Sequence, residues 1–206
     1  MSMVFIISAP SGSGKSTLVK MLLDSVDGVD FSISCTTRAP RKGEVDGGNY
    51  RFLTRGEFLA MRDAGGLLEW AEVFGQLYGT PGAVLERARQ RGHDLVLDID
   101  VQGARQLKEQ IPEAVTVFIL PPSREELEKR LRSRSLDEDA VIARRLADAS
   151  KEIGNYFAYD YILVNDRLDR AAEKLKGIFL AERCRQQRAE AVIRPILQSF
   201  EEREDR

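Results

Sequence analysis

Residues 9–17 read Ala9-Pro10-Ser11-Gly12-Ser13-Gly14-Lys15-Ser16-Thr17, and this stretch decides the fold. It follows the apolar run Val4–Ile7, which is short enough to be a buried strand. It precedes Leu18–Leu23, which reads as the first turns of a helix. A strand, a glycine-rich loop and a helix that opens on Lys-Ser form an arrangement that holds phosphate groups. We therefore predict that residues 9–17 bind a nucleotide.

The residue types of this loop suit phosphate. Gly12 and Gly14 have no Cβ, so backbone N–H groups can turn inward and bind phosphate oxygens together with the helix N-terminus. Lys15 can reach the β- and γ-phosphates, and the Ser16 hydroxyl can ligate Mg²⁺. The phosphate-loop consensus begins with glycine, whereas this chain has Ala9. A plain serine- and glycine-rich turn is the structural alternative, but Lys15 and the flanking elements favour nucleotide binding.

The composition sets wider limits. The chain has 206 residues, enough for one sizeable core with insertions, and 43% of them are hydrophobic. The net charge of −2 gives no reason to expect a nucleic-acid partner. No apolar run reaches membrane-crossing length, and no signal-peptide pattern is present, so we expect no membrane association. Cys35 and Cys184 lack metal-ligand or redox spacing, which favours a reduced, cytoplasmic setting.

Apolar runs and turn residues predict strands that alternate with helices. We expect strands at residues 31–34, 50–54, 67–72, 94–100, 115–120 and 160–165. We expect helices at residues 55–64, 81–91, 101–110, from 123 onward, 168–190 and 191–202. This alternation predicts an α/β fold with a parallel sheet, and ligands bind at the carboxyl ends of such strands.

Several polar residues mark the starts of helices. Thr80 precedes Pro81 and is expected to cap the next helix, a structural role that needs no ligand. Ser123 begins the Ser-x-x-Glu pattern of a capping box. Asp98 and Asp100 end a buried strand, where a carboxylate near the phosphate loop can organise Mg²⁺. A helix cap is the alternative and suits Asp100 better. Which of the two approaches the metal stays open; we choose Asp98 because it ends the apolar run.

Two regions are rich in arginine. Residues 35–50 hold Arg38 and Arg41 in a glycine-rich span that is either a solvated loop or part of a site. The second region holds Arg130, Arg132, Arg134, Arg144 and Arg145. Ion pairing on an exposed helix face explains Arg132 and Arg144. The lone histidine, His93, is expected to be structural.

Further stretches follow a recognisable pattern: Ser8–Ser16, Thr36–Glu44, Glu72–Gly75, Tyr78–Thr80, Leu97–Ala104 and Tyr159–Asp166. On these stretches, which span nearly its whole length, the chain resembles the guanylate kinases, enzymes that phosphorylate GMP with ATP. The phosphate loop alone indicates only a nucleoside triphosphatase. The Thr-Thr-Arg-x-Pro-Arg-x-Gly-Glu run from Thr36 and the Tyr-Gly-Thr at Tyr78 are far more specific.

The resemblance implies the fold of the P-loop nucleoside monophosphate kinases, with a parallel sheet flanked by helices. The core would comprise residues 1–33, 81–121 and 152–206. Residues 34–80 would form an inserted GMP-binding part with a small mixed sheet, and residues 122–151 a helical lid. The implied substrates are ATP and GMP, with dGMP as a further candidate acceptor, and the implied cofactor is Mg²⁺ bound with ATP. The resemblance is compatible with either a monomer or a homodimer.

The resemblance also implies a role for each candidate residue. The guanine base would contact Ser34, Glu69 and Thr80. The GMP phosphate would contact Arg38, Arg41, Tyr50 and Tyr78. ATP would bind Ala9, Pro10, Ser11, Gly12, Ser13, Gly14, Lys15, Ser16 and Thr17, with Mg²⁺ at Ser16 and Asp98. Arg134 and Arg145 occupy the positions of lid arginines, and Arg130 is a weaker candidate. The catalytic set would be Lys15, Arg38, Asp98, Arg134 and Arg145. Where the family often has Arg-Gly in the lid, this chain has Arg134-Ser135.

These residue types fit the chemistry. The guanine edge presents two donors, N1–H and N2–H₂, and the Glu69 carboxylate offers two acceptors. Adenine presents an acceptor there and would leave a buried charge unpaired. Arg38 and Arg41 can each clamp a phosphate through bidentate bonds. Because the attacking phosphate oxygen is already deprotonated, we expect no general base. Charge neutralisation by Lys15, Mg²⁺ and the lid arginines would carry catalysis.

Other classes of nucleotide-binding protein would need different residues in the sequence. A related kinase with another acceptor, such as a ribose bisphosphate, would not need an acid at Glu69. A protein-binding module of guanylate-kinase type can dispense with Lys15 or the lid arginines, and this chain retains both. The absence of an Asn-Lys-x-Asp guanine box from the sequence argues against a switch GTPase.

Overall fold

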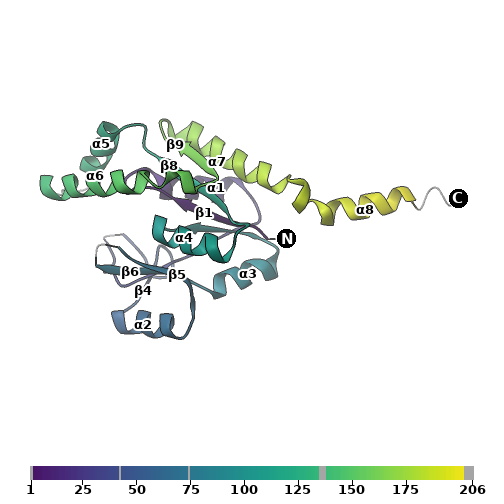
Figure 1. Ribbon diagram of the computed structural model, residues 1–206, viewed down its shortest axis with the longest axis horizontal. Helices are drawn as coiled ribbons and strands as arrows, with labels where there is room; N and C mark the ends of the chain where they lie inside the picture. The colour runs from purple at the N-terminus through teal and green to yellow at the C-terminus, as the bar shows by residue number, and fades with distance from the viewer. Residues whose placement is uncertain (1, 42, 74, 135–137, 202–206) are drawn as a thin grey trace.

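The computed structural model of the protein describes residues 2–41, 43–73, 75–134 and 138–201. Its main sheet is five-stranded and entirely parallel, in the order β2-β7-β1-β8-β9 (Figure 1). The strands are β1 (Val4–Ser8), β2 (Val29–Phe31), β7 (Asp94–Asp98), β8 (Val115–Leu120) and β9 (Tyr161–Val164). Every residue of β1 is buried, as expected for the central strand of a parallel sheet.

Helices cover both faces of this sheet. One face carries α1 (Lys15–Ser25) and α7 (Leu168–Arg183), and the other carries α3 (Ala83–Arg91) and α4 (Val101–Gln110). Alternate residues of β1 point to opposite faces: Phe5 packs with Phe179 of α7, whereas Ile6 packs with Leu107 of α4. The rings of Phe5 and Phe179 stack with centroids 3.5 Å apart. Apolar burial on both faces therefore holds the carboxyl edge of the sheet in place.

A second, four-stranded sheet of mixed direction has the order β4-β3-β6-β5. Its strands are β3 (Cys35–Thr36), β4 (Arg51–Phe52), β5 (Leu67–Val73) and β6 (Gln76–Pro81). Helix α2 (Arg55–Asp63) packs on it through Phe58, which lies with Cys35 and Leu77 in a small core of its own. Thr54 and Glu57 close a capping box that starts α2.

Two further helices lie near the phosphate loop: α5 (Arg124–Arg134) and α6 (Asp139–Ile153). They pack on each other through a separate core of Leu127, Leu131, Ile142, Leu146 and Ala149. The short helix η1 (Tyr156–Ala158) leads from α6 into β9. After α7, the short helix η2 (Gln186–Arg188) leads into α8 (Glu190–Glu201), which projects away from the rest of the molecule (Figure 1).

The predicted fold class is confirmed: an α/β protein with a helix-flanked parallel sheet and a small mixed sheet. The predicted cap at Asp100 is also confirmed, since its carboxylate accepts the N–H of Gly103 at 2.8 Å. At Ser123 the hydroxyl accepts the N–H of Glu126 at 3.2 Å. In the described ranges we find no helix with the length and apolar character that crossing a membrane requires.

Three predictions about elements were wrong. The strand expected at residues 31–34 is β2 (Val29–Phe31), because the chain leaves the main sheet after Phe31 to enter the second sheet. Thr80 caps no helix: it lies inside β6, and the N-cap of α3 is Gly82. The helix expected at 168–190 ends at Arg183, where the chain turns through η2 before α8 begins.

Candidate active site

One cavity of about 630 Å³ opens between the carboxyl edge of the main sheet, the second sheet and α6. Its lining combines residues from both halves of the predicted site. From the phosphate loop come Ala9, Pro10, Ser11, Gly12, Gly14, Lys15 and Ser16. From the predicted acceptor site come Ser34, Arg41, Tyr50, Glu69 and Tyr78. Asp98, Asp100, Arg145 and Glu152 complete the polar lining.

The phosphate loop needs its glycines. Gly12 and Gly14 have φ values of 94° and 90°, a left-handed conformation that disfavours residues with a Cβ. A Cβ at Gly12 would also lie 2.9 Å from Leu131 of α5, and one at Gly14 would overlap the side-chain amide of Asn165. That amide donates to the Ser13 carbonyl at 2.8 Å. The loop is therefore held by Asn165, which follows β9, and by Leu131 of α5.

Helix α1 begins directly after this loop. Its N-cap is Gly14, and no side chain caps its first turn. The free N–H groups of that turn and the helix dipole face the cavity end of the loop, which makes the position suitable for phosphate. Ser16 lines the cavity from the same turn, whereas Ser13 is buried and Thr17 is not part of the lining.

Lys15 forms an ion pair with Asp98 at the carboxyl end of β7. Burial of the ammonium group acts to lower the pKa of Lys15, but the attraction of Asp98 outweighs it, and the pKa is raised. The amine is therefore charged at neutral pH and placed at the junction of β1 and β7. For Tyr50, in contrast, burial raises the pKa, and the nearby Asp98 adds to the rise.

Glu69 lies buried on β5, with 4% of its surface exposed. The Thr80 hydroxyl on the neighbouring strand β6 donates to its carboxylate at 2.6 Å. Gly103, in the first turn of α4, lies so close that a Cβ there would overlap Oε2 of Glu69. Burial raises the pKa of Glu69 to about 7, the Thr80 hydrogen bond opposes this, and Asp100 adds to it. Glu69 is thus a fixed, buried acceptor in the lining of the cavity.

The arginines predicted to hold a phosphate differ in placement. Arg41 lines the cavity, and its backbone N–H donates to Glu44 at 2.7 Å. Arg38 pairs with Glu44 at 2.9 Å and lies over the ring of Tyr50, 5.4 Å from its centre. The rings of Tyr50 and Tyr78 meet edge to face, with centroids 6.0 Å apart. Arg38 therefore stands beside the cavity, held by a carboxylate that an anion could replace.

Helix α6 brings Arg145 to the phosphate loop. A guanidinium nitrogen of Arg145 donates to the Ser11 hydroxyl at 2.7 Å. The other predicted lid arginine, Arg134, ends α5, but its side chain lies outside the described residues, as does Ser135. Arg130 instead donates to the Asn165 carbonyl at 3.0 Å and pairs with Glu126. Of the predicted lid arginines, the structure places Arg145 in the cavity.

The sequence reasoning missed Glu152. It lies two turns after Arg145 on α6 and shares its face, so helical spacing could have identified it. Burial raises the pKa of Glu152 to about 7, Lys15 lowers it, and Asp100 and Asp148 add to the rise. His93 meets the structural expectation: its Nδ1 lies 2.9 Å from Asp30, and it is absent from the cavity lining.

The donor set near Lys15 is one that Mg²⁺ can use. Ser16 and Asp98 offer a hydroxyl and a carboxylate, both hard oxygen donors, in the same cavity. Within the described ranges no three His, Cys, Asp or Glu side chains gather as a metal cluster. A site of this kind suits an ion that keeps water and phosphate oxygens as most of its ligands, as Mg²⁺ does with nucleotides.

The chain is similar to known proteins over most of its length. A family model described as guanylate kinase matches residues 1–182. The guanylate kinase of Koribacter versatilis is 58% identical over 185 residues, which cover 88% of this chain and 79% of that protein. The guanylate kinase of Geobacter metallireducens is 54% identical over 182 residues, covering 88% and 90% respectively.

A solved structure agrees with this relationship. The crystal structure of guanylate kinase from Anaplasma phagocytophilum aligns with a TM-score of 0.77 at 37% identity, covering 91% of this chain and 89% of that one. The matched region includes the phosphate loop, the second sheet, α5 and α6. The chain belongs to the guanylate kinase family.

Proposed function

We propose that this protein transfers the γ-phosphoryl group of ATP to GMP, giving ADP and GDP. One observation carries the proposal: a single cavity is lined both by the phosphate loop with Lys15 and by the buried acceptor Glu69. A donor site and a purine-reading site that share a cavity allow direct transfer between the two nucleotides.

ATP would bind with its β- and γ-phosphates on the N–H groups of Gly12 and of residues 14–17, since the N–H of Ser13 already donates to the Pro10 carbonyl. Lys15 would exchange its partner Asp98 for phosphate oxygens, which is possible because both lie in the cavity lining. Ser16 and Asp98 would hold Mg²⁺, which neutralises phosphate charge when bound. The choice of Asp98 over Asp100 is supported by the cap that already engages Asp100.

The guanine base would be read by Glu69. Its two carboxylate oxygens suit the N1–H and N2–H₂ donors, and Ser34 lies in the same lining. Thr80 holds the carboxylate in place through its hydroxyl rather than lining the cavity itself. We therefore assign Thr80 a positioning role on Glu69, in place of the direct base contact that the resemblance implies.

The GMP phosphate would be held by Arg41, Tyr50 and Tyr78, all in the cavity lining. Arg38 would join them by leaving Glu44 for the dianionic phosphate, since bidentate arginine binding favours phosphate. An oxygen of that phosphate attacks the γ-phosphorus of ATP, and the bond to the bridging oxygen of ADP breaks. No proton transfer by a side chain is needed.

Closure would complete the site. We assign residues 34–80 and 122–151 to two parts that move toward the core, which brings Arg145, and Arg134 with it, over the transferring group. Arginines placed there stabilise the negative charge of the transition state. Exclusion of water would limit hydrolysis of ATP.

The test is an ADP-release assay with purified protein and ATP, in which GMP, dGMP, AMP, UMP and ribose phosphates are offered in turn. We expect turnover with GMP and little with AMP or UMP. In Glu69→Gln the ratio of kcat/KM for GMP to that for AMP should fall by about 30-fold or more, given the cost of about 2–5 kcal/mol for mispairing a buried charge. Preference for a ribose phosphate would contradict the proposal. Glu72→Gln, an exposed change on the same strand, is the matched control.

A further inference from the structure

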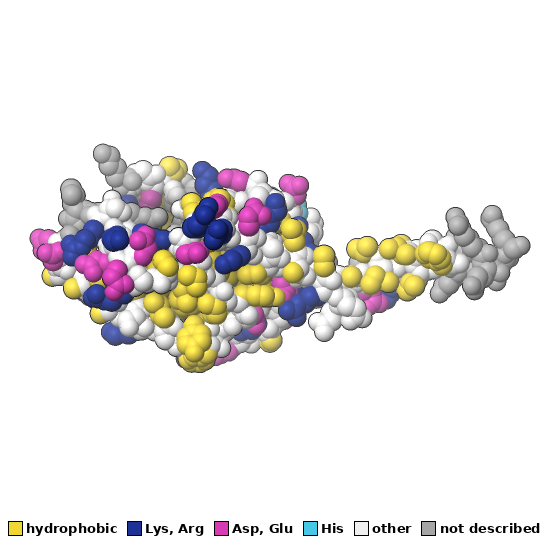
Figure 2. All heavy atoms as spheres, turned by 90° about the horizontal axis from the view of Figure 1, so that it is seen from above, with side chains coloured by type: hydrophobic (Ala, Val, Ile, Leu, Met, Phe, Trp, Pro, Cys, Tyr) yellow, Lys and Arg dark blue, Asp and Glu magenta, His cyan; other side chains and the backbone are white. Residues whose placement is uncertain are grey.

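Helix α8 carries an exposed apolar stripe. Val192, Ile193, Ile196, Leu197 and Phe200 have exposed fractions between 38% for Ile193 and 70% for Phe200. Figure 2 shows hydrophobic side chains gathered along the projecting arm. At a helical period these residues share one side, while Arg194 and Gln198 lie on the other. Every α8 side chain that the structure describes is exposed to solvent.

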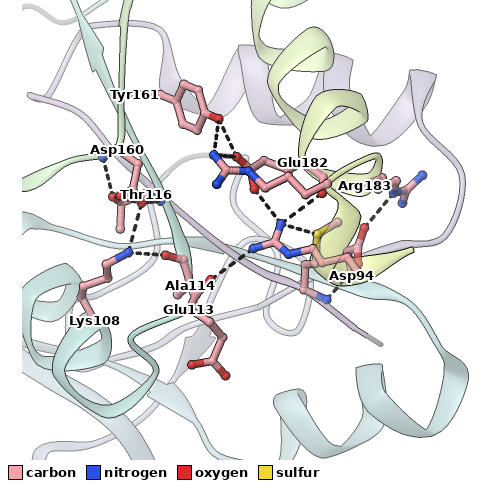
Figure 3. A network of polar contacts seen from close by, with 12 residues as sticks. Asp94, Lys108, Glu113, Ala114, Thr116, Asp160, Tyr161, Glu182 and Arg183 are labelled. Carbon is pink, nitrogen blue, oxygen red and sulfur yellow. Dashed lines mark hydrogen bonds and ion pairs between the residues drawn. The ribbon is translucent and has the colours of Figure 1, made fainter. Parts of the chain in front are cut away.

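The root of this arm is fixed. Glu182, at the end of α7, is buried and accepts hydrogen bonds from Tyr161 at 2.5 Å and from Arg188 at 2.6 Å (Figure 3). Arg188, in η2, also donates to the Glu113 carbonyl at 3.4 Å. Arg185 pairs with Glu182 at 2.7 Å. The arm therefore leaves the molecule from an anchored base, and its apolar side is held away from the body.

A helix in this position needs a partner. Isolated helices shorter than about 12–15 residues are marginal in water. Pro195 inside α8 removes one backbone donor and weakens the helix further. Packing of its apolar side against another surface is the usual source of stability for such a helix.

We propose that α8 pairs with α8 of a second copy of this chain, in antiparallel orientation. The stripe is complementary to itself in that orientation. Phe200, near the end of one helix, comes to lie opposite the smaller Ile193 and Val192 near the start of the other. Parallel pairing would instead set Phe200 against Phe200 and leave a gap between the two Val192 side chains.

The charge of α8 bears on the kind of partner. The paucity of lysine and arginine on α8 disfavours an anionic membrane surface as the occupant.

The area of the stripe predicts a weak dimer. Between two copies it removes roughly 300–700 Å² of apolar surface from water, against about 1,200–2,000 Å² in stable specific interfaces. We therefore expect reversible association in the micromolar range rather than a permanent dimer.

Sedimentation velocity of the full chain, from about 1 μM to a few hundred μM, tests this. We expect a shift from monomer to dimer across the series. Leu197→Glu should raise the dissociation constant at least about tenfold. Gln198→Glu adds the same charge on the opposite side of α8 and should leave it within about twofold. A wild-type protein that stays monomeric throughout, or two variants that associate equally, would overturn the proposal. Unchanged kinase activity verifies that both variants fold.

Disulfide trapping tests the orientation. In a Cys184→Ser background, which removes the exposed thiol, Ile193→Cys and Phe200→Cys are made separately and mixed. Antiparallel pairing predicts that oxidation gives mainly dimers that link position 193 to position 200. A predominance of links between identical positions would contradict the antiparallel pairing.

Discussion

At the scale of the single residue, the charge of Glu69 sets how well the acceptor binds. Burial raises its pKa to about 7, so the carboxyl is mostly protonated below that pH and mostly ionised above it. Only the ionised form offers two acceptors to guanine. We expect KM for GMP to fall by roughly tenfold from about pH 6 to about pH 8, as the ionised fraction rises.

Steady-state kinetics of wild type and Glu69→Gln across this range check the expectation. The GMP phosphate, with a second pKa near 6, and Glu152 also titrate in the range, and their contributions persist in the variant. The difference between the two profiles therefore isolates Glu69. Superimposable profiles would exclude Glu69 from base recognition.

Substitution of Lys15 should affect the phosphate donor site and leave GMP binding at the acceptor site intact. Lys15→Ala removes the ammonium group that would stabilise negative charge on the transferring phosphoryl group in the transition state. We therefore expect kcat to fall by at least about 10²–10³-fold. GMP binding, which depends on the second sheet, should change by less than about twofold. Coupled ADP release and calorimetric titration with GMP measure the two quantities. Lys20→Ala, an exposed change in the same helix, should alter neither. Full activity of Lys15→Ala would remove the phosphate loop from the mechanism.

At the scale of the element, α4 is placed so that its first turn touches the base-reading group. In Gly103→Ala the new Cβ would meet Oε2 of Glu69, and the carboxylate would be displaced from its place beside Thr80. We expect KM for GMP to rise about tenfold with little change in unfolding free energy. Gly177→Ala in α7, where a Cβ meets open space, is the control and should stabilise by roughly 0.5–1 kcal/mol. GMP kinetics and urea unfolding distinguish the two.

Helix α6 offers a second comparison between neighbouring residues. Arg145 reaches Ser11 of the phosphate loop, whereas Arg144 lies 4.0 Å from Asp148 on the same helix. Because an arginine over the transferring phosphoryl group contributes about 10³–10⁵ in rate, Arg145→Ala should lower kcat by at least about 10³-fold. Arg144→Ala should remain within about twofold of wild type. Single-turnover measurements report the chemical step directly, and equal losses in both variants would refute the lid assignment.

Elements were predictable where the signal is local. β1 and β8 are mostly apolar because both faces of a parallel sheet are covered, and Asp100 lies directly before the helix that it caps. The prediction that Thr80 caps a helix was wrong because Thr-Pro is also a common helix start. Only its pairing with β5 shows that Thr80 belongs to a strand. The contact of Gly103 with Glu69 joins elements far apart in the sequence, so no local pattern could have predicted it.

At the scale of the whole molecule, the site depends on three structures that meet at one edge. The main sheet supplies Asp98 and, through the helix α1 that follows β1, Lys15. The second sheet supplies Glu69, with Tyr50 just before β4, and α6 supplies Arg145. The second sheet shares a small core with α2, and α5 and α6 share another, while Leu68 of β5 also packs against the core beneath α3 and α4. The resemblance predicted a division into a core, residues 34–80 and residues 122–151, and this division stays a prediction.

The molecule also divides at its C-terminal end, between the anchored root and the arm. Ending the chain after Arg188 removes α8, whose described side chains are all exposed, so the unfolding free energy should change by less than about 0.5 kcal/mol. Arg188→Ala in the full chain leaves the buried Glu182 without one of its guanidinium partners, and should cost about 1.5–3 kcal/mol. Arg194→Ala breaks only the exposed pair with Glu190 and serves as the control. Urea unfolding at low micromolar protein keeps association between copies out of the comparison. If removal of α8 destabilised the protein as much as Arg188→Ala does, the arm would be part of the folded core, and its apolar side would already be covered within one chain.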